Sequence, residues 1–179
     1  MLIPLGILDY PVSAAAGSYD LLETEILTGS QASVTFSSLN STYGAGYQHL
    51  QVRMVGISPS DVSYLRFNGV SGTSYRNHGL RGNGSTVSSY ASGAAAGQIQ
   101  LSTVLATDTT YTKVIDILDA FDSNKNTTIR ALVANSNQGI ELISGVFMNT
   151  SALTSILLAP FSGTYSAGSR FSLYGLKGA

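Results

Sequence analysis

Residues 32–39 read ASVTFSSL, and this stretch decides the fold because apolar and polar side chains alternate along it. Successive side chains of a β-strand point to opposite faces of its sheet. The alternation therefore predicts a strand that turns Ala32, Val34 and Phe36 toward a core and its hydroxyl-bearing side chains toward solvent.

The same period of two returns farther along the chain. In YQHLQVRMV, Leu50, Val52 and Met54 share one face, and polar side chains share the other. In SYLRFNG, the inward positions hold Leu65 and Phe67. Both segments therefore predict half-buried strands.

About ten segments with strand character follow one another, separated by turns rich in Gly, Ser, Asn and Pro. They are Tyr19–Leu27, Ala32–Leu39, Tyr47–Ile57, Ser63–Asn68, Gln98–Ala106, Tyr111–Asp119, Thr127–Ala134, Ile140–Asn149, Leu153–Ala159 and Ser169–Gly175. Short strands punctuated in this way are typical of a sandwich or a barrel rather than of βαβ units. We therefore predict an all-β fold, an antiparallel β-sandwich.

Some segments leave an alternative open. VIDILDAF, which begins at Val114, has apolar residues at helical spacing, but its β-branched residues favour a strand. IELISGVFMN and LTSILLAP are apolar on both faces, as in strands covered from both sides by another sheet or by a neighbouring subunit. The region Gly69–Gly97, rich in Gly and Ser, is expected to be an exposed loop or a weak pair of strands.

The chain ends in SRFSLYGLKGA, which reads as a core strand rather than as a polar tail. Phe171 and Leu173 occupy inward positions, so we expect the segment to be the last strand of the sandwich and only Lys177–Ala179 to be loose. At the other end, MLIPLGILDY has no basic residue before its apolar part and is interrupted by Pro4 and Gly6. We therefore expect no cleaved secretory signal.

Composition narrows the classes of function. The chain has 9 Lys and Arg against 10 Asp and Glu, a net charge of −1, and no run of like charge that could follow a nucleic acid or an anionic membrane surface. Charged residues make up 11% of the chain, where about 25% is usual, and a surface near neutrality favours association. Cysteine is absent, which excludes disulfides and thiolate metal sites.

The sequence offers two histidines as a possible catalytic base for a nucleophile. They are His49, on the polar face of a predicted strand, and His78. His78 lies in YRNHGLR between Arg76 and Arg81, a pattern that could recognise an acidic or sugar ligand. We favour an ordinary exposed loop, since nothing nearby completes a triad. No pair of carboxylates stands out for a glycosidase either.

A carboxylate metal site could be sought at Asp116, Asp119 and Asp122, where DSNKN resembles the start of a calcium loop. That loop needs Gly at its sixth position and Glu at its twelfth, and these positions hold Thr127 and Val133. The segment is better explained as a turn between two strands. We assign no catalytic, cofactor-binding or metal-binding residue.

RFNG, ILDAFDSNKNTT and the closing SRFSLYG are the most specific of several segments that follow one another along the chain. Together and in this order, the segments resemble a family of jelly-roll virion proteins of tailed bacteriophages, including viruses of cyanobacteria. The resemblance covers roughly residues 18–179 and implies a jelly-roll-like sandwich domain over that range. Residues 1–17 would form a short extended arm in front of it.

The resemblance implies a structural role in the virion and no enzymatic activity. We expect a homo-oligomer, with a homotrimer as the form that the family suggests, acting as a capsid decoration or cement protein. The apolar arm, stiffened by Pro4 and Pro11, would dock onto other virion proteins such as capsid or tail components. The alternative is a tail-fibre or appendage head that binds a host-surface glycan through Arg76, His78 and Arg81.

Overall fold

The computed structural model describes residues 19–58, 62–92, 96–102, 110–135 and 139–178. The regular structure of these ranges consists of twelve strands and one helix of five residues. The elements are β1 (Asp20–Ile26), β2 (Val34–Phe36), α1 (Leu39–Tyr43), β3 (His49–Ile57), β4 (Ser63–Phe67), β5 (Tyr75–Gly82), β6 (Val87–Ala91), β7 (Ile99–Gln100), β8 (Thr110–Leu118), β9 (Thr127–Asn135), β10 (Gly139–Phe147), β11 (Ile156–Pro160) and β12 (Arg170–Leu176).

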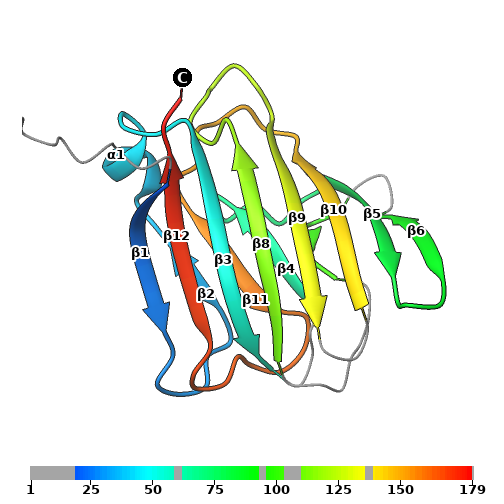
Figure 1. Cartoon of the computed structure of the whole chain (residues 1–179). Coiled ribbons are helices and arrows are strands. Elements are labelled where there is room, and N and C mark those ends of the chain that lie inside the picture. The colour runs from blue at the N-terminus through cyan, green and yellow to red at the C-terminus, as the bar shows by residue number, and fades with distance from the viewer. Residues whose placement is uncertain (1–18, 59–61, 93–95, 103–109, 136–138, 179) are drawn as a thin grey trace, which may run out of the picture.

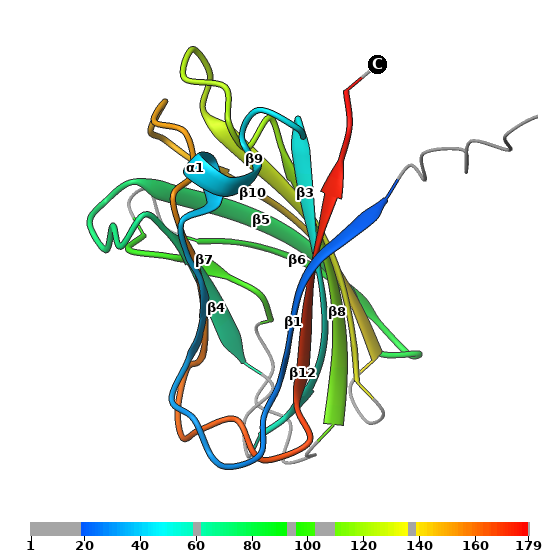
Figure 2. The ribbon, with the colours of Figure 1, turned by 90° about the vertical axis from the view of Figure 1, so that its left-hand side faces the viewer.

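The strands form two antiparallel sheets that face each other (Figures 1 and 2). The large sheet has eight strands in the order β1-β12-β3-β8-β9-β10-β5-β6, and the small sheet has four in the order β2-β11-β4-β7. The predicted all-β sandwich is confirmed.

The strand order is that of a jelly roll with two additions. The hairpins β5–β6 and β9–β10 both extend the large sheet, and without them the remaining strands are β1, β2, β3, β4, β7, β8, β11 and β12. Numbered 1 to 8 in chain order, these strands pair as 1-8-3-6 in one sheet and 2-7-4-5 in the other. Eight strands divided between two four-stranded sheets in this order form the jelly-roll architecture.

The core lies between the sheets and is filled by the inward residues that alternation predicts. Leu50, Val52 and Met54 on β3 are at most 2% exposed, and Phe171 and Leu173 on β12 are fully buried. The segment VIDILDAF enters β8 rather than a helix, so the strand interpretation is confirmed there. Aromatic rings tighten the packing: Tyr75 stacks on Phe147 at 5.0 Å and Tyr165 meets Phe171 edge-on at 4.9 Å.

Each predicted strand overlaps a strand of the structure, but the segment that follows β2 differs. The strand β2 covers only Val34–Phe36, so Ala32 lies before it and is exposed. After β2 the chain enters the helix α1. Ser38 turns the chain with φ 58°, and Leu39 is fully buried at the start of the helix. The burial of this one leucine therefore fixes a helical turn where a longer strand was predicted.

The region Gly69–Gly97 contains the strand pair β5–β6, so the alternative of a strand pair is confirmed and the loop alternative is wrong for these strands. On its other side, β5 runs beside β10 from Tyr75 to Gly82 without a break in register. Of the predicted strand Gln98–Ala106, residues 98–102 are described and contain the short strand β7. Residues 103–106 lie outside the described ranges, as do residues 1–17.

The chain end is also more firmly held than predicted. β12 lies between β1 and β3 rather than at an edge of the sheet. Beyond it, the ammonium of Lys177 lies 3.0 Å from a carboxylate oxygen of Asp20, so the expectation that Lys177 is loose is wrong.

Candidate interaction surface

The face of the large sheet that is turned away from the small sheet, its outer face, carries exposed apolar side chains. Leu80, Leu142 and Leu132 are 54%, 53% and 48% exposed, and Val114 is 37% exposed. Strand pairing places each of the four directly opposite the next, in the order β5, β10, β9 and β8. They form one continuous line across four strands, which we call the apolar row.

A neighbouring line of side chains widens this surface. Ile140, two residues before Leu142 on β10, is 54% exposed, and the line passes through Ala134 and Thr112 to Val55 on β3. No part of the small sheet covers these residues, so coverage of IELISGVFMN by a second sheet on both sides is wrong within one chain. Coverage by a neighbouring subunit stays a prediction.

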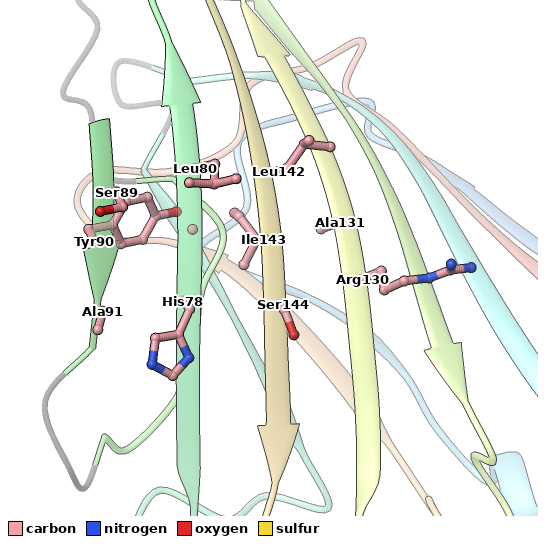
Figure 3. A pocket seen from close by; sticks show the side chains of 11 residues that line it. His78, Leu80, Ser89, Tyr90, Ala91, Arg130, Ala131, Leu142, Ile143 and Ser144 are labelled. Carbon is pink, nitrogen blue, oxygen red and sulfur yellow. The ribbon is translucent and has the colours of Figure 1, made fainter. Parts of the chain in front are cut away.

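A hollow of about 650 Å³ opens on the outer face over β5, β6, β9 and β10 (Figure 3). Leu80 and Leu142 of the apolar row line one side of it, and His78, Ser144 and Arg130 line the other. The hollow therefore combines an apolar side with hydrogen-bonding groups, as small-ligand and protein-docking sites do.

A polar network crosses the outer face beside the apolar row. The Nε of Arg53 donates to Oε1 of Gln51 at 2.7 Å, and Nε2 of Gln51 donates to Oδ1 of Asp116 at 2.6 Å. A guanidinium nitrogen of Arg130 lies 3.3 Å from Oδ2 of Asp116. The network joins β3, β8 and β9.

A second hollow, of about 320 Å³, lies over β3, β8 and β12 and is basic. Its lining includes Arg53 and Arg170. The guanidinium of Arg53 lies 4.4 Å from the ring centre of Tyr174 and 5.4 Å from that of Tyr19, which is the geometry of cation–π contact. In the described part of the chain, neither arginine lies within ion-pair distance of a carboxylate.

The structure separates the residues of YRNHGLR instead of gathering them in a loop. Arg76 and His78 point outward from β5, whereas Arg81 belongs to the inward set of this strand, next to Glu141 of β10. His49 lies at the start of β3, where its Nδ1 accepts the backbone N–H of Asp119 at 2.9 Å. The structure therefore brings neither the two histidines nor the three loop residues together at one site.

The three aspartates considered for a metal do not converge on one point. Asp116 belongs to the network on the outer face, whereas Asp119 and Asp122 both contact Lys125, at 3.0 and 3.3 Å. Hydrogen bonding from Gln48, followed by that from Lys125, lowers the pKa of Asp119 below its ordinary value. Among the described residues, no group of three His, Cys, Asp or Glu side chains is placed to hold a metal ion.

Two charged side chains are buried between the sheets, and the sequence analysis missed both. Lys113 is 1% exposed and donates to the hydroxyl of Ser63. Glu141 is 5% exposed and accepts hydrogen bonds from Tyr90 at 2.8 Å and from Ser102 at 2.9 Å. Burial, together with the bond to Glu141, raises the pKa of Tyr90.

A signal for these two residues was present in the alternation. Lys113 follows Tyr111 and precedes Ile115 in the inward set of β8, and Glu141 precedes Ile143 in that of β10. A charged residue in phase with buried neighbours indicates an interior polar contact. Lys113 on β8 reaches Ser63 of β4, and Glu141 on β10 reaches Ser102, which follows β7, so both residues connect the large sheet to the small one.

Comparisons with protein-family models, with curated proteins and with solved structures found no match to this chain. No helix in the described ranges has the length and hydropathy that a membrane span requires.

Proposed function

We propose that this protein is a non-enzymatic structural subunit of a phage particle, and that it assembles with copies of itself through the outer face of the large sheet. The apolar row is the observation that carries the proposal. Three leucines about half exposed on adjacent strands form a patch of the kind that marks protein interfaces. The low charge content of the chain, 11%, supports the same conclusion.

The place in the particle rests on the sequence resemblance to jelly-roll virion proteins. A capsid decoration or cement protein, as a homotrimer on the virion surface, is the role that agrees best with a compact sandwich carrying an adhesive face. Residues 1–17 would contact neighbouring virion proteins. Mass spectrometry of purified particles, with cryo-electron microscopy to place the density, tests this part of the proposal.

Self-assembly is tested on the purified protein by sedimentation velocity across concentration. We expect an oligomer that Leu132→Asp weakens at least about tenfold, because a charge in the middle of the apolar row must be desolvated on contact. Phe161→Asp is the matched control, since Phe161 is 62% exposed but lies outside the outer face. A wild-type chain that stays monomeric at all concentrations overturns the proposal.

A second candidate function is recognition of a host-surface glycan, which the hollow of about 650 Å³ favours. It places the ring of His78 and the hydroxyl of Ser144 opposite the leucines of the apolar row, while the guanidinium of Arg130 is turned away from the leucines to the carboxylate of Asp116. A glycan array read with wild-type protein and with His78→Ala tests it. Binding that the substitution does not reduce, or no binding at all, removes this candidate.

A further inference from the structure

The large sheet and the small sheet both end at the same side of the sandwich, in β1 and β2. β1 is the first strand of the large sheet and β2 is the first strand of the small sheet. A groove of about 230 Å³ separates them and is lined by Glu23 and Glu25 from β1 and by Thr35 from β2, with Gln31 and Ser33 from the connection between the strands. This edge of the sandwich, which we call the acidic edge, is therefore polar and negatively charged.

The two glutamates have no basic partner in the described part of the chain. None of the ion pairs in these ranges includes Glu23 or Glu25. Charged side chains at an edge strand also prevent a second sheet from pairing with it. The charges of the acidic edge therefore disfavour pairing with the edge strand of another sheet and favour contact with a basic surface.

The basic hollow on the outer face offers the opposite charge. The Arg53 guanidinium is held by two tyrosine rings and by Gln51, so little side-chain freedom is lost when it binds a carboxylate. Arg170 lies on the neighbouring strand β12, two residues before Ser172, which pairs with Arg53. Such diagonal neighbours lie about 7–8 Å apart.

The spacing of the glutamates matches that of the arginines. Glu23 and Glu25 are two residues apart on one strand, which corresponds to about 6.5–7 Å. Exposed apolar side chains adjoin the basic hollow, since Val55 lines it and Ile26 of β1 lies opposite Arg170 on the outer face. Glu23 and Glu25 point to the other side of β1, toward the groove. Charge and spacing therefore agree between the two surfaces.

We infer that the acidic edge of one copy binds the basic hollow of the next, with Glu23 and Glu25 paired to Arg53 and Arg170. This inference rests on the proposed self-assembly and names the partner surface. The contact joins two different surfaces, so it is heterologous: it forms a ring such as a trimer where the rotation between copies closes, and a filament where it does not.

Single-cysteine variants test the contact, because the natural chain has no cysteine. Glu23→Cys and Arg170→Cys each remove one charge and leave the other pair in place. An equal mixture of the two under mild oxidation should give at least about tenfold more disulfide-linked dimer than either variant alone, on a non-reducing gel. Equal or stronger linking within one variant indicates a twofold contact and overturns the inference.

Charge reversal provides the second arm. Two double variants should each weaken assembly at least about tenfold: Glu23→Arg with Glu25→Arg, and Arg53→Glu with Arg170→Glu. The chain that carries all four changes should regain assembly, because the opposite charges face each other again. Arg76→Glu on β5 is the control outside the basic hollow. Thermal unfolding of each variant establishes that it is folded.

The two proposals fail in different ways. If the wild-type chain is monomeric, self-assembly fails, and the edge-to-face contact fails with it. A different result is that the wild-type chain assembles and Leu132→Asp weakens the assembly, while the charge reversals have no effect and the mixture shows no cross-link. In that case self-assembly through the apolar row stands, and only the contact between the acidic edge and the basic hollow is excluded.

Discussion

At the scale of single residues, one glycine shows how closely the hairpin β5–β6 is packed. The ring of Tyr90 on β6 passes over Gly79 of β5 on its way to the carboxylate of Glu141. A methyl group at position 79 would overlap the carbon and oxygen atoms of that ring. The absence of a side chain is therefore a condition for the buried hydrogen bond.

We expect Gly79→Ala to lower the free energy of unfolding by about 1–3 kcal/mol, because the tyrosine must leave its position or strain the strand. Gly82→Ala is a matched control on the same strand, since no atom lies within 4 Å of the added carbon. Urea denaturation of both variants measures the difference. Equal stability of the two would contradict the packing described for Tyr90.

The aspartates at the β8–β9 turn make the free energy of unfolding depend on pH in the acidic range. Asp119 and Asp122 have pKa values below the ordinary 3.8, the first chiefly through Gln48 and the second chiefly through the backbone N–H of Asn124. As pH falls, the unfolded chain takes up these protons first, so stability that is present above about pH 4 is lost as pH drops through the folded-state pKa values.

Replacing Asp119 by Asn should flatten this acid dependence. The amide has no proton to take up in this range, so the difference in unfolding free energy between pH 6 and pH 3 should be smaller than in the wild type. Urea titrations at the two pH values measure it, and Glu23→Gln at the acidic edge serves as a comparison. An unchanged difference for Asp119→Asn would contradict the assignment.

At the scale of elements, β12 is an interior strand of the large sheet. It pairs with β1 on one side and with β3 on the other, and it places Phe171 and Leu173 in the core. Deletion of Ser169–Ala179 should therefore yield insoluble or non-cooperatively unfolding protein, since it exposes the core and two strand edges.

The control for this deletion is a chain that ends at Lys177, which keeps β12 and the contact with Asp20. We expect it to remain soluble, with a single cooperative transition followed by circular dichroism. A soluble, cooperatively folded chain that lacks Ser169–Ala179 would refute the role of β12.

The elements also show what the sequence could and could not predict. Alternation locates strands such as β3 and β12, because their inward residues contact the core directly. It does not locate β5, whose inward set after Tyr75 continues with Asn77 and Gly79 rather than with further large apolar residues. The sequence also indicated that IELISGVFMN could be covered by a neighbouring subunit. It could not predict the apolar row as a line across four strands or the contact of Arg53 with Tyr174. Both depend on strand register, which residues distant in sequence determine together.

At the scale of the whole molecule, the net charge of the chain is close to zero, but basic and acidic side chains lie on different parts of its surface. Basic side chains gather on the outer face around Arg53, and acidic ones gather at the edge around Glu23. The apolar row adds an adhesive surface between these regions and the hairpin β5–β6. This distribution of charged and apolar surface supports the proposed assembly of the chain with its own copies.

Salt separates the two contributions to that assembly. The Debye length falls from about 10 Å at 0.1 M to about 3 Å at 1 M, so the pairs of Glu23 and Glu25 with the basic hollow should be screened while apolar contact persists. We expect wild-type assembly, measured by sedimentation velocity, to weaken severalfold between 0.1 and 1 M NaCl. Arg170→Glu already lacks one pair and should respond less. Assembly that strengthens with salt in the wild type would show that apolar contact alone holds the copies together.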